Sequence, residues 1–459
     1  MAESGPSDEQ EAALQAAADR IDDRDTAGAE AALERLAEYP AGRQQGTKLI
    51  AEAIFAARDD DEKRAIFDFL SPAVIASLHF VSGTNGRFAR AMMMTSWHDE
   101  TAALLRAACD LVPDDAGLAY QYVRFLTRID RPDELKRFID ERDEMFGDPA
   151  NLMALLPGTG LTAEQRDAVR TLVEEMGPDT PKATRLLAVR WLANHGMWEA
   201  AAGAAHRLGV KGSAFRATGM LLDLIDEAPD TGSRPEPFEG ADDVYLRRAP
   251  ESGGLVLLFG AVGDANLLTL WLIDRYLAAL GLSSLIMRDN HRMVFMQGVR
   301  SLAPDRDGTI DRLRAIIDDL GVERLYTLSS SGGGFGAMAY GLMLTAERCL
   351  CFSPVSRIGG VAEHDPRTPV IRERLERQCP PAEWDILDWI DRTEHRMPIS
   401  LYYGRDKAVD RFHAEHLAGQ PDVNLFPVES GGKGGSLLAV AAQRDLGEVI
   451  ARAFDLESP

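Results

Sequence analysis

Hydrophobic residues follow two different spacings along this chain of 459 residues. From about residue 8 to residue 227, alanine and leucine recur at three- and four-residue steps, most regularly in residues 11–21 and 27–39. That period is typical of amphipathic helices. After residue 253, short apolar runs alternate with helix-like segments instead. We therefore expect an all-α first half and an α/β second half.

The second half contains six apolar runs that are short enough to be buried strands. They cover residues 255–259, 284–287, 325–328, 349–352, 399–403 and 423–428. Helix-like segments lie between or after them, at residues 267–280, 309–320, 337–344 and 437–454. Strands that alternate with helices over short connections indicate a mainly parallel sheet with helices on both faces.

Residues 228–252 interrupt both patterns. Pro235 and Pro237 cannot continue a helix, and the small polar residues before them are typical of a linker. We therefore predict three parts: a helical domain at residues 8–227, a linker with the first strand at 228–252, and an α/β domain at 253–455.

Prolines divide the helical half into segments of similar length. They stand at Pro40, Pro72, Pro113, Pro149 and Pro181. These intervals are close to the roughly 34 residues of a tetratricopeptide repeat. The segments 112–149 and 181–208 each have the order helix, turn, helix and resemble degenerate repeats of that kind. The resemblance implies a solenoid whose concave surface binds a protein partner, and a plain helical bundle is the alternative interpretation.

The most specific local pattern follows the predicted strand at 325–328. Ser331 stands in a small-x-Ser-x-Gly pattern, with Ser329 and Gly333 as the small residues. Between a strand and a helix, this pattern is typical of a nucleophile elbow, where the serine lies on a cramped turn. The backbone N–H of Gly332 would then face a developing oxyanion. A phosphate-binding loop and an inert turn are the alternatives, and the former lacks the Lys-Ser/Thr that should follow its glycines.

Residues 331–337 read Ser-Gly-Gly-Gly-Phe-Gly-Ala. Together with the segments 285–289 and 295–299, they resemble bacterial serine esterase-like proteins of the α/β-hydrolase fold. The resemblance covers about residues 253–455. It implies a serine esterase, deacylase or acyltransferase that uses Ser331, acts on an acylated compound or a glycan, and needs no cofactor.

The same resemblance implies the remaining groups of the site. The backbone N–H of Ala261 or of its neighbour Val262 would join that of Gly332 in an oxyanion hole. An acid should follow the predicted strand at residues 399–403, the last strand but one. Asp406 fits the common hydrolase spacing and Asp410 fits the esterase-like group, so both stay open.

The histidine that hydrolases of this fold place after the last strand is missing. No histidine follows His416, and the last predicted strand leads into a glycine-rich stretch. A serine without an adjacent base is a poor nucleophile, with a loss on the order of 10⁴–10⁶ in turnover. His291, after the predicted strand at 284–287, and Lys433 are the candidate substitutes. The absence favours a second interpretation, a catalytically impaired pseudoenzyme that acts as a binding or scaffold protein.

The composition disfavours some classes of binding partner and indicates a cellular compartment. A formal net charge of −23 disfavours nonspecific binding to nucleic acid or anionic membranes, because both need a basic surface. No apolar run approaches the roughly 18 residues that span a bilayer, and the N-terminus lacks the features of a signal peptide. The four cysteines form no C-x-x-C pair, which is typical of a reducing compartment. We expect an acidic cytoplasmic protein. His413 and His416 could hold a metal ion, but a third ligand is missing, so we expect them to lie on a solvated helix face.

Overall fold

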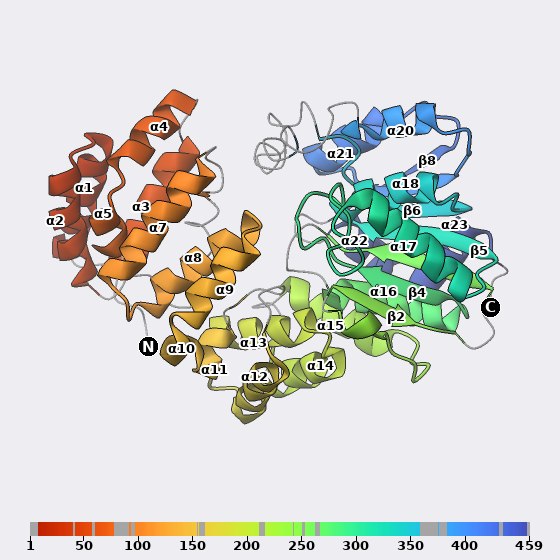
Figure 1. Cartoon of the computed structure of the whole chain (residues 1–459), viewed down its shortest axis with the longest axis horizontal. Helices are drawn as coiled ribbons and strands as arrows, with labels where there is room; N and C mark the ends of the chain where they lie inside the picture. The colour runs from red at the N-terminus through yellow and green to blue at the C-terminus, as the bar shows by residue number, and fades with distance from the viewer. Residues whose placement is uncertain are drawn as a thin grey trace. The chain divides into compact units, whose positions relative to one another are not determined.

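The structure is a computed structural model. It describes residues 8–39, 42–56, 60–77, 91–92, 97–153, 155, 161–210, 216–241, 243–249, 253–261, 267–358, 375, 383–430 and 435–456. The chain divides into two compact units (Figure 1). The first comprises Met1–Glu175 with Pro181–Leu187, and the second comprises Met176–Thr180 with Ala188–Pro459.

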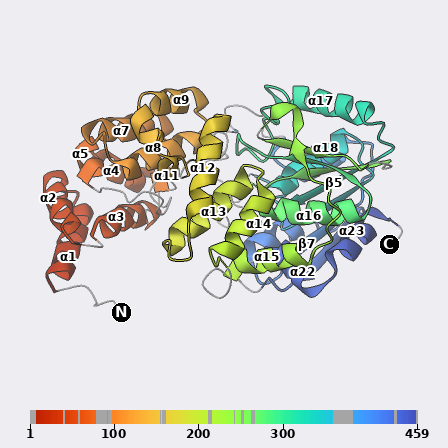
Figure 2. The ribbon, with the colours of Figure 1, turned by 90° about the horizontal axis from the view of Figure 1, so that it is seen from below.

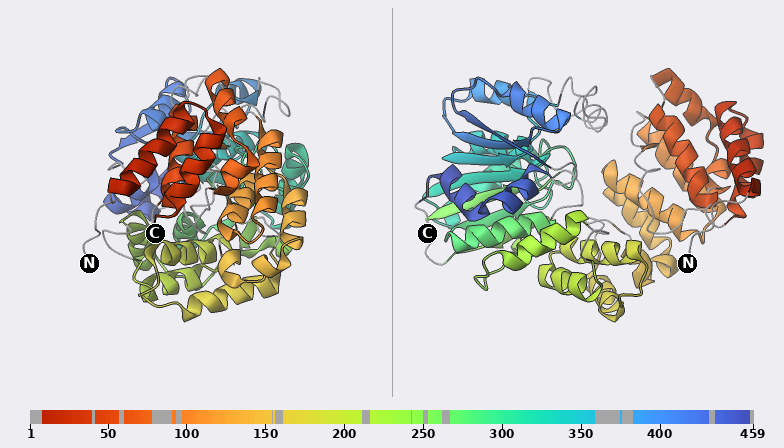
Figure 3. Two further views of the ribbon diagram at one scale, coloured as in Figure 1. Left: turned by 90° about the vertical axis from the view of Figure 1, so that its left-hand side faces the viewer. Right: turned by 180° about the vertical axis from the view of Figure 1, so that it is seen from behind.

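The described part of the first unit is helical (Figure 3, left). Its helices are α1 (Asp8–Asp22), α2 (Thr26–Ala37), α3 (Gly42–Ala56), α4 (Asp60–Phe69), α5 (Pro72–Ser77), α7 (His98–Leu111), α8 (Ala116–Arg128), α9 (Pro132–Asp140), α10 (Asp143–Phe146), α11 (Pro149–Leu152) and α12 (Ala163–Glu175). Helix α13 (Lys182–Asn194) begins in this unit and ends in the second.

Several of these helices begin at start signals that the sequence contains. Asp115 accepts a hydrogen bond of 2.9 Å from the Leu118 N–H at the start of α8. Pro132 and Pro149 are the first residues of α9 and α11, where the missing N–H of proline leaves no donor unpaired. No strand occurs among the described residues of 8–227, in agreement with the expected all-α first half. The tetratricopeptide-like arrangement stays a prediction.

One sheet forms the centre of the second unit. Its strands are β1 (Glu236–Pro237), β2 (Val244–Arg247), β3 (Gly254–Phe259), β4 (Ser283–Met287), β5 (Arg324–Ser330), β6 (Arg348–Phe352), β7 (Ile399–Gly404) and β8 (Val423–Val428). Their order is β1-β2-β4-β3-β5-β6-β7-β8. Strand β2 pairs antiparallel with β1 and β4, and all pairs from β4 to β8 are parallel. The mainly parallel sheet predicted from the sequence is confirmed.

Helices cover both faces of this sheet. The described helices of this unit are α14 (Trp198–Arg207), α15 (Arg216–Glu227), α16 (Leu267–Ala279), α17 (Arg306–Asp319), α18 (Gly333–Met343), α20 (Ile386–Arg392), α21 (Ala408–His416), α22 (Ser436–Gln443) and α23 (Leu446–Phe454), with a short 3-10 helix η2 (Phe238–Gly240). Helices α17 and α18 lie on one face, and α16 and α23 lie on the other (Figure 2). The blue C-terminal helices are seen against the strands in Figure 3 (right). Because both faces are covered, every residue of β3 and β4 is buried, which explains their continuous apolar runs.

Helices α14 and α15 belong to the same unit as the sheet. Arg275 of α16 donates three hydrogen bonds of 2.8–2.9 Å to carbonyls at the C-terminal end of α15. Trp198 of α14 stacks on Trp271 of α16, with ring centroids 6.2 Å apart. The division between the units therefore lies upstream of residues 228–252, and these residues supply η2, β1 and β2.

The single closing helix expected at residues 437–454 is wrong. The structure has two helices there, α22 and α23, separated at Arg444 and Asp445. Arg444 is extended, with φ −144° and ψ 159°. The Asp445 side chain accepts hydrogen bonds from the N–H groups of Gly447 and Glu448 and so begins a new helix.

Candidate active site

Ser331 lies on a tight turn between β5 and α18, at the carboxyl edge of the sheet. Its φ of +59° is in the left-handed region, which residues with a Cβ disfavour. Its N–H donates to the carbonyl of Phe352 at the end of β6 (2.8 Å), and its carbonyl accepts from the N–H of Gly334 (2.9 Å). The side chain is partly exposed. This strand–turn–helix geometry is that of the elbow expected from the sequence.

Two glycines let the elbow approach its neighbours closely. A Cβ on Gly333 would lie 2.4 Å from the carbonyl oxygen of Gly260, which follows β3. A Cβ on Gly334 would lie 2.1 Å from the Cβ of Pro354, which follows β6. Both contacts are closer than a side chain allows, so glycine at these positions brings the elbow against the ends of both neighbouring strands.

Two backbone N–H groups at the elbow have no backbone acceptor among the described residues. Within the described residues, neither the Gly332 N–H nor the Ala261 N–H donates to a carbonyl of the chain. Gly332 follows the serine, and Ala261 follows Gly260, whose carbonyl packs against Gly333. Two N–H donors on adjacent segments beside a serine can stabilise a developing oxyanion. Val262, the other candidate donor, lies outside the described residues.

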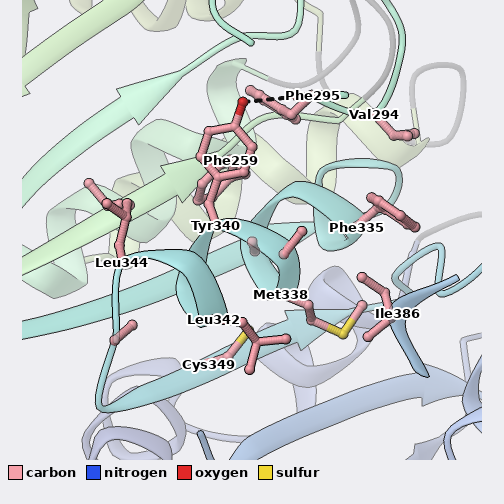
Figure 4. Packing of buried hydrophobic residues seen from close by; sticks show 14 of the residues in the cluster. Phe259, Val294, Phe295, Phe335, Met338, Tyr340, Leu342, Leu344, Cys349 and Ile386 are labelled. Atoms are coloured by element: carbon pink, nitrogen blue, oxygen red, sulfur yellow. Dashed lines mark hydrogen bonds between the residues drawn. The ribbon is translucent and has the colours of Figure 1, made fainter. Parts of the chain in front are cut away.

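The connection after β4 packs beside the elbow. The Phe295 ring meets the Phe259 ring edge-on, with centroids 4.9 Å apart. The Tyr340 hydroxyl of α18 donates to the Phe295 carbonyl at 2.9 Å, as Figure 4 shows. Burial raises the pKa of Tyr340, so its hydroxyl stays protonated and serves as a donor in the core. This packing holds the connection against α18.

His291 lies half-buried in the same connection. Its neighbours Arg292 and Val294 have φ of +57° and +50°, and Asp289 accepts a hydrogen bond of 3.1 Å from the Phe295 N–H. The connection is therefore a defined, strained structure. Among the described residues, no histidine is hydrogen bonded to the Ser331 hydroxyl.

The structure gives the two candidate acids different partners. Asp406 accepts hydrogen bonds of 2.8–2.9 Å from the N–H and hydroxyl of Ser430. Ser430 lies in the connection after β8, where a hydrolase places its histidine. The described hydrogen bonds of this candidate acid thus come from a serine of that connection.

Asp410 is joined instead to the end of β6. Its Oδ2 accepts a hydrogen bond of 2.6 Å from the Ser353 hydroxyl and one of 3.1 Å from the Gly404 N–H. The Ser353 hydroxyl also lies 2.8 Å from the hydroxyl of Ser436, a buried residue at the start of α22. Sequence reasoning missed Ser353. No local motif marks it, and its partner Asp410 is 57 residues away along the chain.

His413 and His416 of α21 have hydrogen-bond partners in the connections after β6 and before α20. His413 is buried, and its Nδ1 accepts a hydrogen bond of 3.1 Å from the Ser356 N–H. His416 pairs with Asp385 at 2.7 Å. The expected solvated face is therefore wrong for His413, because the helix turns it toward the connection after β6. Lys433 lies outside the described residues.

Two kinds of feature are absent from the described residues. No group of three or more His, Cys, Asp and Glu side chains is arranged to hold a metal ion. No helix in that part of the chain is long and apolar enough to cross a membrane.

The strand order, with only β2 running against the other strands, and the serine elbow after β5 together identify the architecture of the second unit. It is the α/β-hydrolase fold. No family model and no curated protein matches the sequence. Solved structures are similar to about half of the chain.

Three of these similar structures are named as enzymes. The S-formylglutathione hydrolase from Agrobacterium tumefaciens is 14% identical over 49% of this chain and 96% of that chain, with a TM-score of 0.37. The capsule O-acetyltransferase of Neisseria meningitidis serogroup A is 15% identical over 50% and 98%, with a TM-score of 0.36. Esterase B from Lactobacillus rhamnosis is 12% identical over 52% and 96%, with a TM-score of 0.39.

Proposed function

We propose that this chain is a serine acyl-transfer enzyme, an esterase, deacylase or acyltransferase, whose nucleophile is Ser331. The observation that carries the proposal is the φ of +59° at Ser331, on a turn from strand to helix. A strained non-glycine residue costs about 1–3 kcal/mol and is found mainly at functional sites. An inert turn would avoid that strain with a glycine.

The backbone around Ser331 supports the same reaction class. Ser331 Oγ would attack the carbonyl carbon of an acylated substrate, while the N–H groups of Gly332 and Ala261 stabilise the charge on the carbonyl oxygen. One such donor accounts for a factor of about 10²–10³ in kcat. The acyl group would then pass from Ser331 to water in a hydrolase, or to an acceptor hydroxyl such as that of a glycan in an acyltransferase.

A base must accept the proton of Ser331. His291 is the histidine candidate, because its connection packs beside the elbow. Asp406 and Asp410 are the carboxylate candidates after β7. Hydrogen bonds to the nucleophile often form only when substrate binds, so their absence from the free protein does not exclude a base.

One observation favours a second candidate function. Ser430 lies in the connection after β8, where a catalytic histidine would stand, and it donates hydrogen bonds to Asp406. In this second candidate the chain is a pseudoenzyme that binds a ligand or partner and serves as a scaffold. In that case the folded protein turns over no ester, although it retains the elbow.

The first unit supports a further part of the proposal. Its helices pack on their neighbours along the chain, α1 on α2, α7 on α8 and α8 on α9. Helices stacked in this way present an extended surface that recruits a protein partner. We propose that this unit is a tetratricopeptide-like domain which brings an acylated substrate or its carrier to Ser331 in the cytoplasm.

Hydrolysis of p-nitrophenyl acetate by the full chain tests the enzyme proposal. We expect turnover above the buffer rate in wild type and turnover at the buffer rate in Ser331→Ala. The matched control is Ser330→Ala, since Ser330 is the preceding residue and makes no side-chain hydrogen bond among the described residues. Equal rates in wild type and Ser331→Ala would leave the pseudoenzyme as the better account.

A further inference from the structure

A second serine at the same edge of the sheet shares the unusual backbone of Ser331. Strands β5 and β6 pair in parallel with Ser330 opposite Phe352, so Ser331 and Ser353 are the next residues in register. Neighbouring parallel strands lie about 4.8 Å apart. Ser353 has a φ of +48°, also in the left-handed region. Two serines with a positive φ therefore directly follow two adjacent parallel strands.

Ser353 differs from Ser331 in having a carboxylate partner. Its hydroxyl donates to Asp410 Oδ2 at 2.6 Å, which is typical of a charge-assisted hydrogen bond. Its oxygen also lies 3.4 Å from the Ser436 N–H, at the start of α22. A helix N-terminus favours negative charge on that oxygen. The carboxylate itself is fixed by the Gly404 N–H, and a Cβ on Gly404 would lie 2.9 Å from it.

We infer that Ser353 and Asp410 together accept the proton of Ser331. The inference rests on the proposed function and supplies the base that it leaves open. Asp406, Lys407 and Arg411 are the charged residues nearest to Asp410 along the chain. The hydrogen bonds to Asp410 come from Ser353, after β6, and from Gly404, at the end of β7. In this proposal Ser353 links Ser331 to a carboxylate, and Asp410 is a positioning residue that acts through Ser353.

The reaction balances with these groups alone. As Ser331 Oγ bonds to the acyl carbon, its proton moves to Ser353 Oγ, and the Ser353 proton moves to Asp410 Oδ2. When the bond from the acyl carbon to the leaving oxygen breaks, Asp410 returns its proton to Ser353, which protonates the leaving group. The products are acyl-Ser331, a neutral alcohol and the original carboxylate. Water or an acceptor hydroxyl then repeats the sequence to release the acyl group.

The test uses full-length Ser353→Gly, Ser353→Ala and Asp410→Asn with p-nitrophenyl acetate. Glycine adopts the φ of Ser353 without strain, so Ser353→Gly removes the hydroxyl from a fold that stays intact even if the alanine variant does not. We expect kcat to fall about 10²-fold or more, as for loss of a general base, with KM changed less than about threefold. A merely structural role would raise KM or lower stability together with kcat.

The matched controls are Ser330→Ala, at the last residue of β5 and directly before Ser331, and Glu415→Gln, an exposed acid on the same helix as Asp410. Folded Ser353→Gly with wild-type kcat overturns the inference while Ser331-dependent turnover still supports the proposed function. Loss of kcat in His291→Ala, with Ser353→Gly unaffected, overturns it in favour of an imidazole base. Wild-type protein without Ser331-dependent turnover overturns both proposals.

Discussion

The backbone strain at Ser331 is the clearest link between one residue and a function. Its φ of +59° is held by hydrogen bonds to both sides of the turn, from its N–H to Phe352 and from Gly334 to its carbonyl. Such strain persists only where the surrounding structure fixes it. Serine at this position lowers the stability of the folded state, but it fixes the position of one hydroxyl group.

Replacing Ser331 by glycine should therefore stabilise the chain. Glycine adopts a positive φ without strain, whereas alanine keeps the strain of a Cβ. We expect Ser331→Gly to have a free energy of unfolding about 1 kcal/mol higher than that of Ser331→Ala. Urea denaturation of the two variants measures this difference, and an alanine variant of equal or greater stability would contradict the account.

Gly333 should tolerate no side chain. A Cβ there would lie 2.4 Å from the Gly260 carbonyl oxygen, so the elbow must move away from the end of β3. We expect Gly333→Ala to lower the free energy of unfolding by about 1–3 kcal/mol, as overpacking does, and to abolish esterase activity. Gly203 in α14 is the control, since a Cβ there meets nothing within 4 Å. If Gly333→Ala is as stable and active as Gly203→Ala, the close approach is not needed.

At the scale of elements, Asp385 connects helices α20 and α21. It begins α20 by accepting a hydrogen bond from the Leu387 N–H (2.9 Å), and it pairs with His416 at the end of α21 (2.7 Å). Burial alone would raise the pKa of Asp385. The hydrogen bonds from His416 and Leu387, with the charges of His416 and Arg357, outweigh burial and lower that pKa.

A lowered pKa gives Asp385 a stabilising role that depends on pH. Because its folded pKa lies below its unfolded value of about 3.9, the contribution is complete above that value and is lost as pH falls through the folded pKa. We expect Asp385→Asn to lower the free energy of unfolding by about 1 kcal/mol at pH 7, as for a lost N-cap. The difference from wild type should shrink below about pH 4. Denaturation curves at pH 7, 5 and 3.5 measure it, and a difference that grows in acid would contradict the assignment.

Elements with a local signal could be predicted from the sequence, and contacts across long separations could not. The strands at 255–259 and 325–328 are buried on both faces, so a continuous apolar run was enough to find them. The elbow could be found because its small residues are adjacent along the chain. Ser353 and Ser430 could not, because their partners are set by how β6, β7 and β8 end at one edge.

At the scale of the whole molecule, composition predicted a boundary at 228–252, whereas the packing divides the chain earlier. Proline-rich sequence marks where a helix must end, but it does not reveal which core the preceding helices join. Arg275 holds the C-terminal end of α15, and Trp198 stacks on Trp271. Two helices of the helical half are thus part of the sheet-bearing unit.

Hydrogen exchange in increasing denaturant tests this division. We expect α14 and α15 to lose protection together with β3 and β5, and separately from α7 and α8, because cooperative units follow packing. Arg275→Ala should lower the free energy of opening of residues 216–227 by about 1–3 kcal/mol, because it removes charged hydrogen bonds. The amide hydrogens of these residues should therefore exchange faster. The control is Arg314→Ala on exposed α17 surface. Exchange of α15 in step with α7 would contradict the division.

The central claim is that Ser331 is a nucleophile that a carbonyl or phosphonyl group can reach. Labelling of the folded full-length chain with a fluorophosphonate probe, followed by mass spectrometry of the labelled peptide, tests it most directly. The account predicts slow labelling that approaches one probe per chain, located on Ser331 and absent from Ser331→Ala, with Ser330→Ala labelled like wild type. Folded wild-type protein that takes up no probe, or takes it up equally in Ser331→Ala, would contradict it.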